Sequence, residues 1–139
     1  MDSDPLDKPS AAKPVVRLML VDDTQIVLDR LRATLGAITG VHVVGTAHSV
    51  AEAIPKVRQL QPDLITLDIG LDKSNGWDVL QFVKQAHPNI RVFVFSNDTG
   101  VATRARFTTG GADEFFDKSN DFGALCQAVQ NLVVAHSQT

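Results

Sequence analysis

The sequence predicts an α/β domain, a doubly wound, five-stranded parallel sheet with helices on both faces. Apolar runs and amphipathic segments alternate five times between residues 15 and 137. The apolar runs are continuous rather than alternating, which is typical of strands buried on both faces. Strands that alternate with helices favour a parallel sheet with right-handed crossovers. With 139 residues, 44% of them hydrophobic, the chain is long enough to build one such core.

Five short apolar runs are the predicted strands. Each lies between segments of helical periodicity, and the last is only a dipeptide. They are Val16–Val21, Val41–Ala47, Leu64–Leu67, Val92–Phe95 and Phe115-Phe116.

The first two helices have clear starting signals. Thr24–Leu35 carries an apolar stripe, and Asp22 or Asp23 could cap it, because Asp is a favoured N-cap residue. Ser49 and Glu52 form a capping-box pattern at the start of a second helix. That helix spans Val50–Leu60 and contains Pro55, which should kink it.

The last three helices are placed by turn residues and by periodicity. One covers about Trp77–Ala86, after Asn75-Gly76 and before Pro88. The next covers about Val101–Thr109, ends at Gly110-Gly111 and is the least amphipathic. The fifth carries apolar residues at helical spacing: Phe122, Leu125, Cys126, Val129, Leu132 and Val133.

Composition excludes several classes of protein. Residues 1–14 hold three prolines and read as a solvated tail, which leaves one domain over residues 15–137. A net charge of −3 indicates no nucleic acid or membrane surface as a partner. No apolar run is long enough to span a bilayer, and the acidic start is unlike a signal peptide. A single cysteine, Cys126, excludes an internal disulfide and is expected to be a core thiol. The chain is expected to be soluble and cytoplasmic.

Polar residues follow four of the predicted strands where they end. Asp22-Asp23 follow the first strand, Asp68 the third, Ser96 the fourth and Asp117-Lys118 the fifth. These ends lie along one edge of a parallel sheet, where open α/β folds build their sites. Three carboxylates, a hydroxyl and an ammonium group would converge there. Such a set can hold a divalent cation and accept a phosphoryl group on an aspartate.

This constellation resembles the active site of bacterial response-regulator receiver domains, and the resemblance covers residues 15–135. Gly76 lies eight residues after Asp68, and the stretch 111–118 places an aromatic residue three positions before Lys118, as in that family. The resemblance implies the strand order 2-1-3-4-5 of a flavodoxin-like fold. It also implies a phosphoaccepting switch in a two-component or phosphorelay system, which promotes its own phosphorylation and dephosphorylation and is not otherwise an enzyme.

The resemblance also assigns roles to the site residues. Asp23 and Asp68 would bind Mg²⁺ (or Mn²⁺) directly, Asp22 through water, and Gly70 through its backbone carbonyl. Asp68 would accept the phosphoryl group from a histidine kinase or a histidine phosphotransfer protein. Lys118 would pair with its oxygens.

A switch from the site to the surface is implied as well. The hydroxyl of Ser96 would turn inward to the phosphoryl group, and Phe115 would follow it from an exposed to a buried position. The surface formed by the fourth helix, fifth strand and fifth helix would then change for a downstream protein partner. The sequence leaves the oligomeric state open.

Three residues depart from the family pattern, and all lie in loops that set rate and partner choice. Asp72 and Ser119 stand where the family often has proline, and Asn97 stands where it prefers a very small residue. Gly70, Asn97 and Asp98 are the expected rate-tuning positions. Because a cis bond before a non-proline residue costs about 3–4 kcal/mol, the Lys118–Ser119 bond should be trans.

Alternatives from other classes follow from the same residues. A haloacid-dehalogenase-type phosphohydrolase also uses a strand-end Asp, but it has a second Asp two residues later, where this chain has Gly70. A degenerate receiver that only binds proteins is disfavoured because every reacting group is present. The chain is expected to act as a stand-alone receiver, the alternative being a fragment of a longer DNA-binding regulator. Like-charge repulsion predicts that neutralising Asp22 or Asp23 raises the melting temperature without metal.

Overall fold

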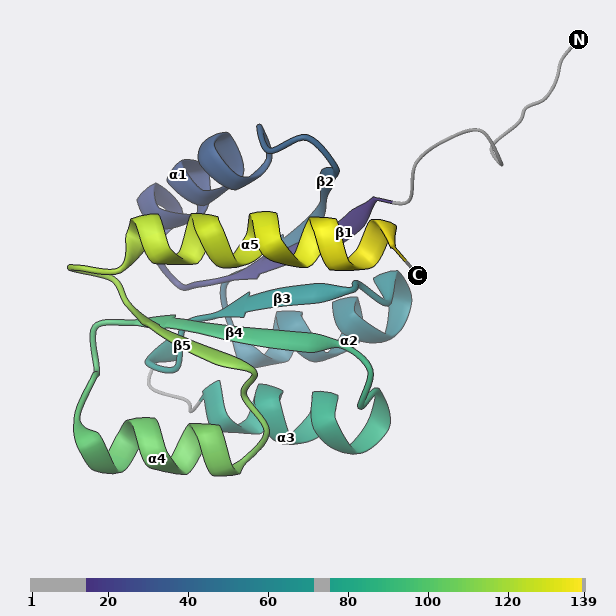
Figure 1. The fold of residues 1–139 in the computed structure, drawn as a ribbon. Coiled ribbons are helices and arrows are strands. Elements are labelled where there is room, and N and C mark those ends of the chain that lie inside the picture. Colours follow the sequence, from purple (N-terminus) through teal and green to yellow (C-terminus); the bar gives the residue numbers. More distant parts are fainter. Residues whose placement is uncertain (1–14, 72–75, 139) are drawn as a thin grey trace, which may run out of the picture.

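Five parallel strands form one sheet in the order β2-β1-β3-β4-β5 (Figure 1). The computed structural model describes residues 15–71 and 76–138. The predicted fold class and strand order are confirmed. The elements in chain order are β1 (Val16–Val21), α1 (Gln25–Leu35), β2 (Val41–Ala47), α2 (Val50–Leu60), β3 (Leu64–Leu67), α3 (Gly76–Ala86), β4 (Arg91–Ser96), α4 (Val101–Thr109), β5 (Glu114–Asp117) and α5 (Phe122–Ser137).

The sheet divides the core into two layers. Helices α1 and α5 cover one face, and α2, α3 and α4 cover the other (Figure 1). Successive strand residues point to opposite layers, so Leu18 and Leu20 face α1 and α5, whereas Met19 and Val21 face α2 and α3. Every residue of β3 is buried, as its continuous apolar run predicted.

Two strands are longer than their apolar runs. β4 begins at exposed Arg91 and reaches Ser96, and β5 begins at exposed Glu114 and reaches Asp117. Ser96 and Asp117 are partners in the ladder between these strands, so main-chain pairing continues beyond the apolar residues. Ser96 therefore stands on the sheet itself, at its carboxyl edge.

The starts of the first two helices differ in detail from expectation. Thr24, not Asp22 or Asp23, occupies the N-cap position of α1. Asp22 acts instead through a turn, because its Oδ1 accepts a hydrogen bond from the Thr24 amide at 2.9 Å. In α2, Ser49 accepts from the Glu52 amide as expected, while Glu52 accepts from the amide of His48, one residue before the cap.

Several remaining expectations can be compared with the structure. The helix α2 continues across Pro55. Cys126 packs against the core layer beneath α5, as expected of a core thiol, but it is partly buried rather than buried. Within residues 15–71 and 76–138, no helix combines the length and apolar character needed to cross a membrane. The predicted tail (residues 1–14), Asp72 and Asn75 lie outside the described residues.

Candidate functional site

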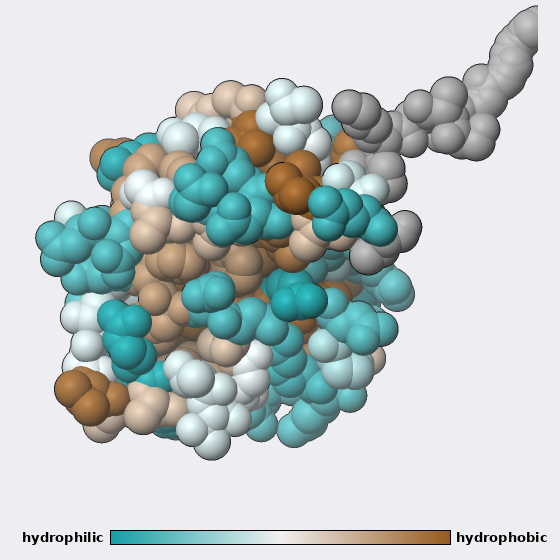
Figure 2. Space-filling view, in the orientation of Figure 1, coloured by the Kyte–Doolittle hydropathy of each residue, from teal (hydrophilic) through white to brown (hydrophobic). Residues whose placement is uncertain are grey.

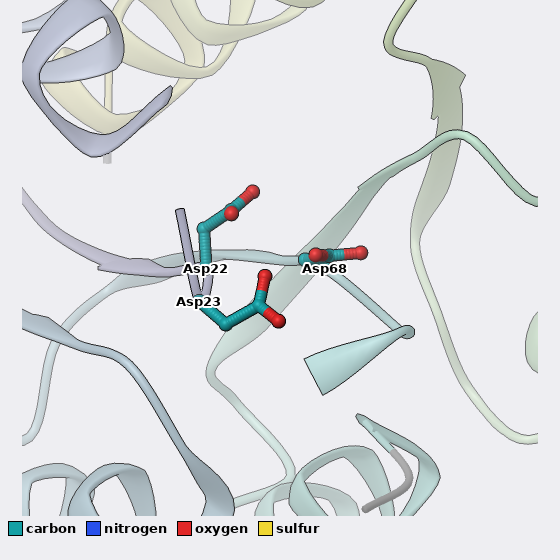
Figure 3. A group of neighbouring side chains, drawn as sticks. All are labelled: Asp22, Asp23 and Asp68. Carbon is teal, nitrogen blue, oxygen red and sulfur yellow. The ribbon is translucent and has the colours of Figure 1, made fainter. Parts of the chain in front are cut away.

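Three aspartates meet at the carboxyl edge of the sheet, as the strand-end pattern predicted. Asp22 and Asp23 follow β1, and Asp68 follows β3 (Figure 3). These strands are neighbours whose last paired residues are Val21 and Leu67, so the residues that come next lie side by side. One carboxylate oxygen from each aspartate lies within 4.8 Å of the others. Figure 3 shows the three side chains lying close to one another.

The three carboxylates are held in different ways. Asp22 and Asp68 are buried, with exposed fractions of 1% and 7%, whereas Asp23 is exposed. Asp68 Oδ1 accepts a hydrogen bond from the Gly70 amide at 3.1 Å. Asp23 Oδ1 accepts one from the Thr24 hydroxyl at 3.3 Å. Backbone amides two residues further along the chain therefore hold the buried carboxylates of Asp22 and Asp68. Asp23 lies on the solvent side of the cluster.

Lys118 brings a positive charge to the two buried acids. Its Nζ lies 2.7 Å from Asp22 Oδ2 and 3.3 Å from Asp68 Oδ2. Its backbone amide donates to the Ser96 carbonyl, which extends the β4–β5 ladder by one step. The Lys118–Ser119 bond is trans, as expected, and the ammonium group still reaches the aspartates.

Burial and charge shift the ionisation of this group. Burial raises the pKa of Asp68, and the charge of Asp22 adds to that effect, although the Gly70 amide and Lys118 oppose it. Burial alone would lower the pKa of Lys118. Its hydrogen bond to Asp22 and the charges of Asp68 and Asp22 outweigh burial and raise this pKa, so the lysine is a firmly held cation at neutral pH.

Ser96 lies at the end of β4, and its hydroxyl is buried, with 2% of the residue exposed. The oxygen accepts a hydrogen bond from the Asp98 amide at 3.0 Å, which leaves the hydroxyl proton available to another acceptor. The Asp98 carboxylate is directed to the start of α4, where it accepts from the Thr103 hydroxyl at 3.4 Å. Asp98 therefore connects the Ser96 loop to α4.

Asn97 borders a cavity beside Lys118. The cavity has a volume of about 210 Å³ and is lined by Val27, Arg30, Leu31, Phe95, Asn97 and Lys118. Asn97 is exposed, whereas Phe95 and Leu31 form a buried apolar floor. The expected role of Asn97 at the approach to the site stays a prediction.

Two glycines shape the loop after Asp68. A Cβ atom on Gly76 would lie 2.6 Å from the Ile69 Cα and 2.8 Å from the Asp68 carbonyl oxygen. Only glycine permits this approach, which explains its spacing from Asp68. Gly70 is exposed, and a Cβ there would lie 3.7 Å from Asp68 Oδ1, in ordinary contact.

Phe115 and Phe116 point to opposite faces of β5. Phe116 is buried beneath α5, whereas Phe115 is half-buried and packs against the layer beneath α2, α3 and α4. The Arg104 guanidinium from α4 lies 4.5 Å from the centre of the Phe115 ring, and it donates to the Phe115 carbonyl at 3.1 Å. Nothing in the sequence singles out Arg104, because an arginine on a weakly amphipathic helix carries no signal by itself.

A family model for the response regulator receiver domain matches residues 18–130. The chain belongs to the response-regulator receiver-domain family. The family is therefore the receiver domain and not the haloacid-dehalogenase type. Receiver domains belong to response regulators of two-component signalling systems.

Individual relatives agree with this assignment. The chain is 30% identical over 119 residues to a protein-glutamate methylesterase/protein-glutamine glutaminase of Trichodesmium erythraeum, covering 84% of this chain and 34% of that protein. It is 27% identical to the response regulator GacA of Pseudomonas viridiflava, covering 84% of this chain and 54% of that protein. The receiver domain thus spans about one third to about half of these relatives.

Solved structures are similar over nearly the whole domain. The response regulator domain of Thermotoga maritima CheB has a TM-score of 0.76 and 26% identity, covering 90% of this chain and 98% of that one. A LuxR-family response regulator from Aurantimonas has a TM-score of 0.80 and 28% identity, covering 88% of each chain. Receiver domains generally bind Mg²⁺ through acidic residues, and the aspartate cluster has that composition.

Proposed function

We propose that this chain is a magnesium-dependent phosphoacceptor switch, in which Asp68 takes a phosphoryl group from a phosphohistidine. The observation that carries the proposal is the arrangement of charges around Asp68. Two further carboxylates lie within 4.8 Å of it, and one lysine contacts both it and Asp22. An ordinary solvated aspartate at a strand end is not surrounded by two carboxylates and a lysine, so this arrangement favours a binding site over a plain surface acid.

The donor set fits a hard divalent cation. The three aspartates offer carboxylate oxygens, which Mg²⁺ and Mn²⁺ prefer, and exposed Asp23 leaves room for the waters that Mg²⁺ keeps. Asp23 and Asp68 would hold the ion directly, Asp22 through water, and the Gly70 carbonyl would complete the set. When bound, the ion offsets the repulsion between the Asp68 carboxylate and the incoming phosphoryl group.

The transfer makes one bond and breaks one. A carboxylate oxygen of Asp68 bonds to phosphorus, and the bond from phosphorus to the donor's imidazole nitrogen breaks, so the imidazole leaves with the bonding pair. Asp68 then no longer carries the charge that attracted Lys118. The Nζ, 3.3 Å from Asp68 Oδ2 before transfer, contacts a phosphoryl oxygen instead and stays tethered by Asp22.

The remaining groups carry the change to the surface. The Ser96 hydroxyl donates its unused proton to a phosphoryl oxygen, which draws the β4–α4 loop toward the site. Half-buried Phe115 moves into the space that this shift opens and loosens its stack with Arg104. The surface of α4, β5 and α5 then presents a different face to a downstream protein. A histidine kinase or a histidine phosphotransfer protein supplies the phosphoryl group.

Intact-mass measurement after incubation with acetyl phosphate and magnesium tests the assignment. One phosphoryl group should be added to the wild type and none to Asp68→Asn. Asp78→Asn, which changes an exposed acid in the first turn of α3, is the matched control and should label normally. Labelling of Asp68→Asn at the wild-type level would show that another residue accepts the group. Steady turnover of a generic phosphate ester would instead indicate a hydrolase.

A further inference from the structure

Two cations and no acid line the cavity beside Lys118. This Arg30 cavity, of about 210 Å³, is lined by Val27, Arg30, Leu31, Phe95, Asn97 and Lys118. The ammonium group of Lys118 contacts Asp22 and Asp68. Arg30, by contrast, forms no ion pair with any acid in residues 15–71 and 76–138. The Arg30 cavity is therefore a cationic recess at the edge of an acidic site.

An aromatic ring holds the guanidinium of Arg30 in place. Its central carbon lies 3.9 Å from the centre of the Phe122 ring, over the ring face. The Phe122 ring in turn lies 6.1 Å from that of Phe95, which is buried in the floor of the cavity. Such a stack uses the face of the guanidinium and leaves its N–H groups, which lie in the plane, free to donate. Arg30 is thus pre-positioned to bind an anion.

The apolar part of the cavity favours an organic anion over a bare inorganic one. Buried Leu31 and Phe95 and half-buried Val27 supply apolar contact. A cavity of about 150 Å³ can hold benzene, so this one has room for an acyl group of a few carbons but not for a nucleotide. The loop between β5 and α5 presents hydrophilic surface at the carboxyl edge (Figure 2), so the cavity offers apolar contact that this loop does not.

Lys118 relates the cavity to phosphoryl transfer. Its Nζ lies 3.3 Å from Asp68 Oδ2, and the same residue lines the cavity. A donor whose phosphoryl group meets Asp68 and Lys118 therefore has the cavity beside it for its leaving group. When that group is a carboxylate, negative charge grows on its oxygen as the bond to phosphorus breaks, and a positioned guanidinium stabilises this charge. A nitrogen leaving group that departs as a neutral amine gains nothing from a cation.

We propose that the Arg30 cavity is the leaving-group pocket for small acyl phosphates, and that Arg30 makes the protein prefer them over donors with a nitrogen leaving group. The inference rests on the proposed function, in which Asp68 is the acceptor. A carboxylate oxygen of Asp68 bonds to phosphorus, and the bond from phosphorus to the acyl oxygen breaks. The carboxylate leaves with the bonding pair, no proton is transferred, and Arg30 binds the carboxylate in the cavity.

Loading rates of the full chain with magnesium and two small donors test the proposal. Acetyl phosphate releases acetate, and phosphoramidate releases ammonia. Arg30→Gln should slow loading from acetyl phosphate about tenfold, the effect of one charged hydrogen bond, and should leave loading from phosphoramidate unchanged. Arg30→Lys keeps the charge without the planar fork and should recover part of the rate.

Arg58→Gln is the matched control. Arg58 is an exposed arginine of α2 that also stacks on a phenylalanine, 5.1 Å from the centre of the Phe82 ring, and α2 covers the other face of the sheet (Figure 1). Its substitution changes the net charge as Arg30→Gln does. Both loading rates of Arg58→Gln should therefore equal those of the wild type.

Salt separates binding in the cavity from attraction at a distance. The Debye length falls from about 10 Å at about 0.1 M salt to about 3 Å at about 1 M. The difference between the wild type and Arg30→Gln should persist at high salt, because Arg30 contacts the leaving group. Loss of the difference at high salt would show that Arg30 only attracts anions, which overturns the proposal.

The remaining outcomes also decide between the two proposals. Equal slowing of both donors in Arg30→Gln, with a melting temperature showing that the variant is folded, overturns the leaving-group pocket. An unchanged rate with acetyl phosphate does the same. In both cases Asp68 remains the acceptor. Failure of both donors to label the wild type overturns the proposed function itself, and the pocket with it.

Discussion

Lys118 is bound more closely to Asp22 than to Asp68. Its Nζ lies 2.7 Å from Asp22 Oδ2 and 3.3 Å from Asp68 Oδ2, and both acids are buried. Asp22 therefore anchors the lysine, while the longer contact leaves Asp68 less committed to it. This asymmetry distinguishes two buried acids that the strand-end pattern alone does not tell apart.

The anchoring contact changes what neutralisation of each acid should do. The sequence predicted that neutralising either Asp22 or Asp23 stabilises the metal-free protein. In Asp22→Asn, the loss of a charged hydrogen bond of about 2 kcal/mol outweighs relief of repulsion of about 1 kcal/mol. The variant should therefore be less stable by about 1 kcal/mol. Asp23→Asn removes an exposed member of the cluster and should raise the melting temperature slightly. Urea and thermal unfolding without metal measure the stability change of each variant. If the two variants shift the stability equally and in the same direction, Asp22 does not differ from Asp23 as an anchor for Lys118.

Magnesium should stabilise the wild type against unfolding. A ligand that binds only the folded state adds about 2.7 kcal/mol when present at 100 times its dissociation constant. Asp23→Asn should lose most of this gain because it removes a ligand from the carboxylate cluster. Asp78→Asn should respond like the wild type. A melting temperature independent of Mg²⁺ and Mn²⁺ would show that the aspartates do not hold a metal.

The raised pKa of Asp68 predicts a definite pH dependence without metal. Between the ordinary value of 3.8 and the higher folded pKa, the folded state binds more protons at Asp68 than the unfolded state does. Stability from this group is therefore complete below the ordinary value and is lost as pH rises through the folded pKa. The stability of Asp68→Asn relative to the wild type should grow across that window and then level off. Urea unfolding of both proteins at a series of pH values measures how their difference in unfolding free energy changes with pH. A difference that stays constant across this pH range would contradict the prediction.

The loop after Asp68 should tolerate no side chain at Gly76. In Gly76→Ala, a Cβ would lie 2.6 Å from the Ile69 Cα and 2.8 Å from the Asp68 carbonyl oxygen, both rigid backbone atoms. The variant should be less stable by about 2 kcal/mol and should accept phosphoryl groups more slowly, since the strain falls on Asp68. Gly123→Ala is the control, because nothing lies within 4 Å of its added Cβ. Unchanged stability and loading rate in Gly76→Ala would show that the loop can move aside freely.

The sheet and the carboxylate cluster could be predicted because each depends on a local signal. Continuous apolar runs mark buried strands, and parallel strands place Asp22 and Asp68 at one edge whatever the loops do. The apolar pattern does not mark strand residues whose side chains are exposed. Arg91 and Glu114 belong to strands through main-chain pairing, but their exposed side chains carry no apolar pattern.

Contacts between elements could not be predicted because they depend on how helices lie on the sheet. The stack of Arg104 on Phe115 requires the position of α4 relative to β5. The Trp77 ring lies 5.2 Å from that of Phe107 in an edge-on contact, which joins α3 to α4 although the two residues are far apart in sequence. The preference of Lys118 for Asp22 also depends on the path of the loop after β5, which the pattern of residue types leaves open.

Asn97 should limit how quickly phosphoryl donors reach Asp68. Asn97 and Lys118 both line a cavity of about 210 Å³, so Asn97 lies beside the group proposed to hold the phosphoryl oxygens. An amide there narrows the approach for any donor, whereas on the other flank Gly70 has no side chain and leaves a path for water. Asn97→Ala should therefore speed loading from acetyl phosphate and from a histidine kinase, with a smaller effect on spontaneous hydrolysis of the aspartyl phosphate.

Gly70→Ala, whose Cβ would make only ordinary contact with Asp68 Oδ1, should mainly slow hydrolysis. Loading and decay followed by intact mass separate the two steps. Slower or unchanged loading in Asn97→Ala would show that the amide does not obstruct the donor, and an equal acceleration of hydrolysis would show that water uses the same path.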